Sequence, residues 1–548
     1  MLDRLRALLP NTPIKVMVGM ASGADLLVAT AAIERGLAVD AVLPMPLEDY
    51  VADFDPESEA QLRSLLAHAN VETTVLGSSE RGQRVTPASV AARDALYLNV
   101  TRALIRRSTL MIALWDGELS LLPAGTADTV TRFLTSHSAP KPVTSVSFVE
   151  AEDVPSGRQT VYWISVARED GVPATTRPPP CYVTGIGEGL LRRHANMPDE
   201  LRAQLADLDR YNREFAALDS AHRTPRPETL LQELEAEVSA PEHALLARID
   251  SEYCKADTLA VYCQTRSLRL FKTFGYMASG MGLLFLSYSE LVENEIFMLG
   301  YIVLLLLGLS LFHSFRSRHW FSKHLAYRAL AETMRTQFFL RLTGADRETD
   351  AAELLKLAGI EQFTGFAWIT TVLRSVQPLN DLGPPSGDHE RGRLRVVLHE
   401  WLDAQQSYFK RKVGQLEHTH KRLEGMKRML LYVLALVTLS LLVFARTLEH
   451  LVFADISAKH FLLFLMGLLP VWLGIWELYQ DKLATRELLW QYRNQLGHFS
   501  RAKLEIDHAQ DPDRRLSVLA DLGKDSLMEC YLWTIHRFHR EHEPPSAG

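Results

Sequence analysis

The stretch "IFMLGYIVLLLLGLSLFHSF" (Ile296–Phe315) contains no Asp, Glu, Lys or Arg, and 13 of its 20 positions are Leu, Ile, Val or Phe. A helix rises about 1.5 Å per residue, so a helix of this length spans about 30 Å, which is the thickness of the hydrocarbon core of a bilayer. The stretch therefore predicts a transmembrane helix.

Three further runs lack acidic and basic residues, and each is 17 residues long: 273–289, 429–445 and 460–476. A helix buried in a soluble core is the alternative for each run. Short connectors pair 273–289 with 296–315 and 429–445 with 460–476, and this pairing favours two membrane hairpins. We therefore expect four spans.

Basic residues flank the hairpins, whereas the connector "LVENE" of the first hairpin carries only acidic charges. The positive-inside rule then places both termini on the cytoplasmic side. The absence of charged residues within the spans argues against an ion-coupled carrier, because such carriers need ionisable groups at depth. It leaves open a pore that is gated by an apolar constriction. The flanking residues are Arg266, Arg269, Lys272, Arg316, Arg318, Lys323, Lys421, Arg422, Lys427, Arg428 and Lys482.

The two hairpins belong to a longer internal repeat. "LAYRALAETMR" begins at Leu325 and "LATRELLWQYR" begins at Leu483; "FAWITTVLR" around Trp368 corresponds to "YLWTIHRFH" around Trp533. We therefore assign one two-span repeat to 246–379, a linker to 380–392 and a second repeat to 393–543. A pseudo-symmetric membrane unit of this kind is expected to assemble further, as a homo-oligomer.

The N-terminal third has a different pattern. "VMVGMASGADLLVAT" (Val16–Thr30) reads as a strand, a glycine-containing turn and a helix, and "LAVDAVLP" (37–44) reads as the next strand. "LMIALWDGELSLLPAGTADTVTRF" (110–133) repeats the strand, turn and helix order. Helix N-termini at the carboxyl ends of parallel strands converge on one crevice, where backbone N–H groups face an anion such as a phosphate. We expect an α/β, doubly wound, Rossmann-like domain over 1–170, then a linker with tether helices over 171–245, then an all-α membrane domain with a cytosolic helical bundle.

The motifs "GMASGADLLVATAAIERG", "VLPMPLEDYVADF", "WDG" and "GTADTV" resemble the SLOG superfamily of nucleotide-binding Rossmann-like domains, which includes DprA, the LOG phosphoribohydrolases and the sensor domain of TRPM channels. The membrane part, through "YRALAETMRTQFF", "FAWITTVLR" and "LADLGKDSLMECYLWTIHR", is similar to SLATT domains, two-span effector modules of bacterial conflict systems. The resemblance implies a ligand-binding set of Gly19, Met20, Ser22, Gly23, Asp25, Pro44, Asp116, Gly117, Gly125 and Thr126.

The sequence departs from the SLOG pattern in two ways. The family's first strand and its glycine-containing loop have no counterpart after residue 1, so either the natural start lies upstream or this copy is degenerate. LOG enzymes carry a catalytic glutamate in their glycine-rich motif, and Thr129 stands at that position here. Without a general acid or base there, we expect binding without turnover and no catalytic residue.

The composition argues against some classes of binding partner. The net charge of −7 gives no footprint for nucleic acid, and the four scattered cysteines predict no metal site. The resemblance implies a multi-pass protein of the bacterial inner membrane, in which nucleotide sensing controls a pore-forming or membrane-perturbing effector in antiphage defence. The expected partners are the lipid bilayer and a nucleotide or nucleotide-derived ligand, with no required cofactor. The alternatives are a membrane-tethered nucleotide hydrolase or transferase, and a scaffold that binds no ligand.

Overall fold

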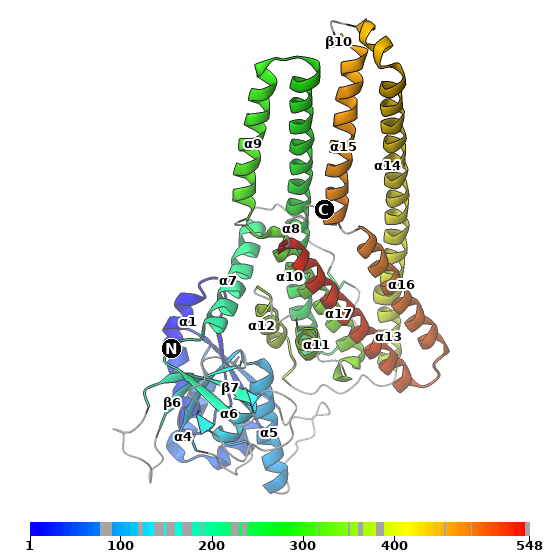
Figure 1. Ribbon diagram of the computed structural model, residues 1–548. Coiled ribbons are helices and arrows are strands. Elements are labelled where there is room, and N and C mark those ends of the chain that lie inside the picture. The colour runs from blue at the N-terminus through cyan, green and yellow to red at the C-terminus, as the bar shows by residue number, and fades with distance from the viewer. Residues whose placement is uncertain are drawn as a thin grey trace. The chain divides into compact units, whose positions relative to one another are not determined.

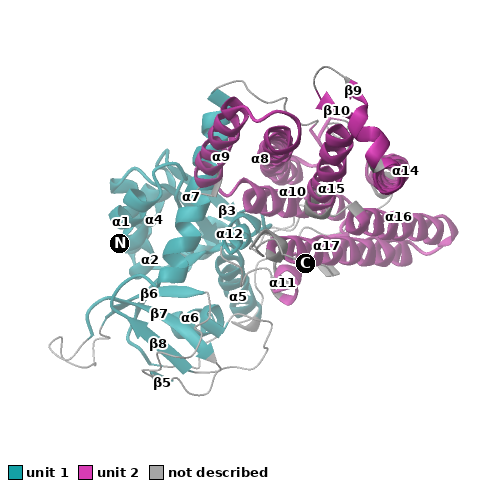
Figure 2. Cartoon of the chain, turned by 45° about the horizontal axis from the view of Figure 1, so that its top comes forward, with its two compact units in different colours: residues 1–223, 361–383 teal, residues 224–360, 384–548 magenta. Residues whose placement is uncertain are grey.

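The computed structural model divides the chain into two compact units, which are coloured separately in Figure 2. Unit 1 comprises Met1–Arg223 and Glu361–Gly383, and unit 2 comprises Thr224–Ile360 and Pro384–Gly548. The structure describes residues 1–76, 90–118, 124–135, 147–148, 159–166, 178–187, 190–220, 229–232, 238–316, 318–348, 351–359, 365–379, 388–453, 456–483 and 485–542.

Unit 1 is an α/β unit (Figure 1). Its helices are α1 (Leu2–Leu8), α2 (Ala24–Glu34), α3 (Leu47–Tyr50), η1 (Val51–Asp53), α4 (Pro56–Leu66), α5 (Val90–Arg107), α6 (Thr126–Thr135), α7 (Asp199–Ser220) and α12 (Trp368–Ser375). Its strands are β1 (Lys15–Val18), β2 (Ala38–Leu43), β3 (Val71–Val75), β4 (Leu110–Trp115), β5 (Ser147–Phe148), β6 (Thr160–Ser165), β7 (Cys181–Gly187) and β8 (Leu190–His194).

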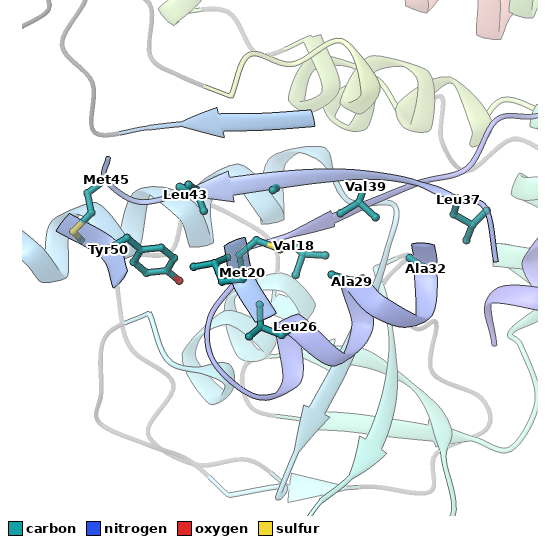
Figure 3. Close-up of a cluster of buried hydrophobic side chains, with 12 residues drawn as sticks. Val18, Met20, Leu26, Ala29, Ala32, Leu37, Val39, Leu43, Met45 and Tyr50 are labelled. Atoms are coloured by element: carbon teal, nitrogen blue, oxygen red, sulfur yellow. The ribbon is translucent and has the colours of Figure 1, made fainter. Parts of the chain in front are cut away.

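The first sheet is parallel and has the order β1-β2-β3. Its central strand β2 is buried from Val39 to Leu43, as expected of a parallel strand that is covered on both faces. Val18, Leu26 and Ala29 pack with β2 in one apolar cluster, which joins β1 and α2 to the sheet (Figure 3).

The second sheet has the order β4-β6-β7-β8-β5 and is mixed, because β7 runs antiparallel to both of its neighbours. The starts of the two sheets share one apolar cluster: Ile14, just before β1, and Leu110, in β4, pack with Leu5, Leu201 and Leu205. The α/β character of the N-terminal region is confirmed. A single doubly wound sheet stays a prediction, because the described strands form two separately hydrogen-bonded sheets.

Unit 1 extends further than the expected domain of 1–170. Residues 181–220, expected within a tether, form β7, β8 and α7 of this unit. The structural reason is that β7 hydrogen-bonds to β6 and to β8, so the hairpin completes the second sheet. Most of the Pro-rich run 171–180 lies outside the described residues.

Unit 2 is predominantly helical. It contains α8 (Ala240–Leu286), η3 (Ser287–Leu291), α9 (Glu295–Arg316), α10 (Trp320–Thr343), η4 (Ala345–Glu348), α11 (Ala351–Leu357), α13 (Asp388–Val396), η6 (Val397–Asp403), α14 (Ala404–His450), the short strands β9 (Val452–Phe453) and β10 (Ile456–Ser457), α15 (Ala458–Leu483), α16 (Thr485–His508) and α17 (Pro512–His542).

Three helical segments in the described part of the chain are long and apolar enough to cross a membrane: Glu295–Ser314 on α9, Arg391–Phe444 reaching along α14, and Ala458–Leu478 on α15. They account for the predicted spans 296–315, 429–445 and 460–476. The remaining predicted span, 273–289, lies on the end of α8 and on η3, and is not among the three. Its Gly, Ser, Ala and Tyr residues make it less apolar than the others.

Glycines allow the end of α8 to pack closely on its neighbours, beside α9 and α15 (Figure 1). A Cβ added at Gly282 would lie 2.8 Å from Val471 of α15, and one added at Gly467 of α15 would lie 2.8 Å from Leu286. The hydroxyl of Ser279 donates to the carbonyl oxygen of Gly275 at 2.8 Å. The helix therefore offers neighbours a small, internally hydrogen-bonded face.

A partly buried ion network joins α8 to α10. Arg328 pairs with Asp257 at 3.1 Å and with Glu332, while Arg335 pairs with Glu332 at 3.0 Å. Arg335 also donates to the hydroxyl of Tyr253 at 2.8 Å. Because each charge in the network has an opposite partner, the cost of burying it is offset.

Candidate ligand site at two strand–helix turns

The first candidate turn runs from the end of β1 to the start of α2. Met20 adopts a positive φ of 59°, and its side chain is fully buried among Val18, Leu26 and Tyr50 (Figure 3). Met20 was in the predicted ligand set, but its side chain points into the core. Only its backbone is therefore available at the turn.

Gly19 is fixed by close packing. The hydroxyl of Tyr50 donates to the carbonyl oxygen of Gly19 at 3.1 Å. A Cβ added at Gly19 would lie 3.1 Å from Asp25 Oδ2 and 3.2 Å from Val100 Cγ1. An alanine at this position would therefore require the side chains of Asp25 and Val100 to move slightly.

Ser22 and Gly23 form the open part of the same turn. Both are exposed, and Ser22 Oγ lies 3.0 Å from Ser58 Oγ. Gly23 is the N-cap of α2 with φ of 88°, no side-chain cap bond is made there, and an added Cβ would meet open space. The first N–H groups of a helix have no partner within the helix, so this end of α2 presents donors to a ligand.

Asp25 holds the turn together from within α2. Its Oδ2 accepts the N–H of Ala21 at 3.1 Å, and its carboxylate also interacts with the backbone of Gly19. Burial raises the pKa of the Asp25 carboxyl, and the two backbone hydrogen bonds oppose that shift. Asp25 thus uses part of the donor capacity of the turn for the protein's own structure.

The second candidate turn, before α6, is also closed by an Asp side chain that accepts a backbone N–H. Ala124 has a positive φ of 61°, and its N–H donates to Asp128 Oδ2 at 3.0 Å; Arg132 pairs with Asp128 at 2.6 Å. The sequences of the two turns align as "ASGAD" (21–25) and "AGTAD" (124–128). The sequence analysis missed Asp128 and Ala124, although this short internal repeat was the signal that could have found them.

Two consecutive residues of α5 contact the two turn regions. The side chain of Val100 lies beside Gly19, and the hydroxyl of Thr101 lies 3.2 Å from the hydroxyl of Thr129 on α6. Helix α5 therefore lies beside both Gly19 and α6, which begins at Thr126 directly after Gly125. Thr129 occupies the position of the LOG glutamate, and its hydroxyl faces α5.

The remaining predicted residues are held at the ends of their own strands. Pro44 is buried directly after β2, so it is a core residue. Asp116 Oδ1 accepts the N–H of Glu118 at 3.0 Å, and Gly117, with φ of 90°, packs on the ring of Trp163. The residues that follow, 119–123, lie outside the described ranges.

A polar cluster lies beside Tyr50, close to the first turn. Arg93 of α5 pairs with Asp53 at 2.6 Å and donates to the carbonyl oxygen of Asp49 at 3.1 Å, while the hydroxyl of Tyr97 donates to Asp53. Burial raises the pKa of Tyr97 to about 12, so this hydroxyl keeps its proton at neutral pH. The sequence analysis did not identify this cluster, since its residues come from separate elements.

Together the turns offer helix N-terminal donors and two carboxylate acceptors. Donors suit phosphate oxygens, whereas carboxylates suit the hydroxyl groups of a sugar. Among the described residues, no group of three or more His, Cys, Asp or Glu side chains gathers as a metal site requires.

Comparisons with protein-family models, with curated proteins and with solved structures find no match to this chain.

Proposed function

We propose that the chain is a membrane-embedded effector in which the α/β unit senses a nucleotide or nucleotide-derived ligand and thereby controls a membrane-perturbing or pore-forming helical unit. One observation carries the sensing part: two turns of matching sequence, each closed by an Asp on the following helix, meet adjacent residues of α5. A site with two similar halves suits a ligand that has two polar ends, such as a nucleoside phosphate.

The proposal extends the three candidate membrane helices to four spans in two hairpins. Its support is the packing of the α8 end against α15 through Gly282 and Gly467. The helix lengths also favour a duplication, because α8 and α14 each have 47 residues and α10 and α16 each have 24. In this proposal the termini are cytoplasmic, the membrane is the bacterial inner membrane, the subunits form a homo-oligomer, and the doubly wound arrangement describes unit 1.

An enzyme remains the second candidate, since a nucleotide held between two turns is also the geometry of a hydrolase. Position 129 argues against LOG-type hydrolysis: it carries a threonine whose hydroxyl lies against Thr101. A hydroxyl without an adjacent base does not serve as a general acid or base at neutral pH.

The test uses the full chain in detergent with a panel of ATP, ADP-ribose, NAD and cyclic dinucleotides. Ligand-induced thermal stabilisation without release of base or phosphate supports a sensor, because a ligand that binds only the folded state raises the melting temperature. Product release supports the enzyme. An unchanged melting temperature across the panel contradicts nucleotide sensing. Dye release from liposomes containing the protein tests the membrane function separately.

A matched pair of variants tests the electrostatics of the first turn. Ser22 is exposed there, so Ser22→Glu places a negative charge at the start of α2, while Ser22→Gln adds the same volume without the charge. We expect Ser22→Glu to lower the apparent affinity for a phosphorylated ligand tenfold or more, which is about 1.4 kcal/mol. Ser22→Gln should lower this affinity much less. The size of the ligand-induced thermal shift measures both effects. Equal effects of the two variants would contradict an anion at this turn.

A further inference from the structure

Helix α12 belongs by sequence to the first repeat, yet it packs within unit 1. The chain leaves unit 2 after Ile360, adds Glu361–Gly383 to unit 1, and re-enters unit 2 at Pro384 (Figure 2). The first membrane hairpin precedes this excursion and the second hairpin follows it. In the chain, α12 therefore lies between α9 and α14.

Four contacts among the described residues hold α12 to α7 and to the end of α5. The ring of Trp368 packs on that of Tyr211 with centroids 4.6 Å apart, and Gln204 donates to the hydroxyl of Thr371 at 2.8 Å. At the other end of α12, Arg374 donates to the carbonyl oxygen of Ser108 at 2.6 Å, and Arg107 donates to the carbonyl oxygen of Ser375 at 3.1 Å. Trp368, Ile369, Val372 and Leu373 are buried, so the apolar face of α12 is fully used.

Helix α5 joins this docking site to the two turns. Val100 and Thr101 contact the turn regions, and Arg107 and Ser108, two helical turns further on, contact α12. A helix transmits displacement along its axis because its backbone hydrogen bonds keep it rigid. Helix α5 and the residue after it therefore contact both the turn regions and α12.

The second repeat lacks such an excursion. The segment around Trp533, which corresponds in sequence to that around Trp368, belongs to α17 and remains in unit 2. There α17 packs on α10: the hydroxyls of Tyr531 and Thr333 lie 2.7 Å apart, and a Cβ added at Gly523 would lie 2.7 Å from Leu340. Two related segments thus belong to different units, and only the one between the hairpins belongs to the α/β unit.

We infer that α12 is the coupling element of the protein: its docking on α5 and α7 sets the conformation of both hairpins, and ligand binding at the two turns acts through it. The inference rests on the proposed function for the source of the signal. The coupling itself is a property of the chain and is testable without a ligand.

The test compares the full-length protein in nanodiscs with the double variant Thr371→Val and Arg374→Ala by hydrogen–deuterium exchange. The variant removes the bonds to Gln204 and to the Ser108 carbonyl, so exchange in 365–379 should accelerate on the order of tenfold. Under the inference, exchange also changes in unit 2, at the ends of α8, α9, α14 and α15. The matched control is Arg102→Ala, since Arg102 lies exposed on α5 and its guanidinium donates to Asn99 of the same helix.

A faster exchange that is confined to 365–379 would overturn the inference. If the double variant does not fold, Thr371→Val alone removes one hydrogen bond with little change of volume and gives the same comparison. The nucleotide panel and the dye-release assay judge the proposed function independently. A propagated exchange change with no nucleotide response therefore rejects the sensor and keeps the coupling element.

Discussion

At the scale of single residues, Asp25 and Asp128 have matching roles. Each lies in the first turn of its helix and accepts the N–H of the residue four positions earlier, at 3.1 and 3.0 Å. A carboxylate in this place also interacts favourably with the helix dipole. The two residues therefore keep the turns in shape whether or not a ligand is present, and they contribute negative charge to the site.

The first prediction separates the hydrogen bond of Asp25 from its charge. Asp25→Ala removes the acceptor for Ala21 N–H and should lower stability by about 1 kcal/mol, as loss of a helix N-terminal acceptor does. Asp25→Asn keeps an acceptor oxygen and removes the charge. Its loss of stability should therefore be smaller than that of Asp25→Ala, and the Asn variant should bind a phosphorylated ligand more tightly than the native chain. Thermal melts of the two variants decide the matter, and an Asn variant as unstable as the Ala variant would contradict this role.

Glu529 gives the chain a pH dependence. Its side chain is 14% exposed, and neither carboxylate oxygen has a hydrogen-bond partner within the described residues. The Nε2 atom of His498 on α16 lies 3.7 Å from Oε2 of Glu529. Asp525 lies on the same helix as Glu529 and is also close to His498. Burial and repulsion from Asp525 raise the pKa of Glu529 to about 7, from an ordinary value of 4.5.

The second prediction follows from the sign of that shift. Between pH 4.5 and 7 the folded chain holds a proton that the unfolded chain releases, so this group's contribution to stability falls as pH rises through that window. Above pH 7, Glu529→Gln should be more stable than the native chain, on the order of 1 kcal/mol. Below pH 4.5 the native chain and the Glu529→Gln variant should have the same melting temperature. Asp521→Asn is the control, since Asp521 is 62% exposed on the same helix, and a similar pH dependence in that variant would refute the assignment.

At the scale of elements, glycines set how closely α8 and α15 approach. Gly467 lies against Leu286, whereas an added Cβ at Gly474 of the same helix would meet open space. The third prediction is that Gly467→Leu lowers the free energy of unfolding by 1–3 kcal/mol, roughly the cost of overpacking. Gly474→Leu should have a smaller effect. Melting temperatures in detergent measure both, and equal losses would show that the close approach does not stabilise the pair.

Some helices and strands could be predicted from the sequence and others could not. Apolar length alone located α9, α14 and α15, and the strand-glycine-helix pattern located β1 with α2 and β4 with α6, because both patterns are local. Strands β7 and β8 were missed, since a Pro-rich run precedes them and was read as the start of a tether, whereas β7 pairs with both β6 and β8 in the fold. Nothing in "FAWITTVLR" distinguishes it locally from "YLWTIHRFH", so the docking of α12 on Tyr211 could not be predicted from the pattern.

The sequence predicted only part of the candidate site. Glycines 19 and 23 lie at the turn that the pattern indicated, but the burial of Met20 and of Pro44 is set by side-chain packing, which a turn motif does not specify. The polar cluster of Arg93, Asp53 and Tyr97 joins α5 to η1 across 40 or more residues, and only the fold brings it together.

At the scale of the whole molecule, α9 and α14 carry apolar stretches that are long enough to cross a bilayer. Leu306, midway along α9, is 61% exposed, and so is Leu504 on α16, outside the candidate spans. The fourth prediction is that Leu306→Arg reduces the fraction of protein that stays in membranes after an alkaline wash, because an arginine at mid-span costs about 2.5–3.5 kcal/mol. Leu504→Arg should remain membrane-bound, and matching losses would place α9 outside the lipid.

The discontinuous course of unit 1 also orders the protein's biosynthesis. Tyr211 is translated long before Trp368, the ring that covers it, and α8 and α9 emerge from the ribosome in between. Until α12 is made, Tyr211 lacks the ring that packs on it in the folded unit. The contacts that complete the α/β unit therefore form only after α8 and α9 have been synthesised.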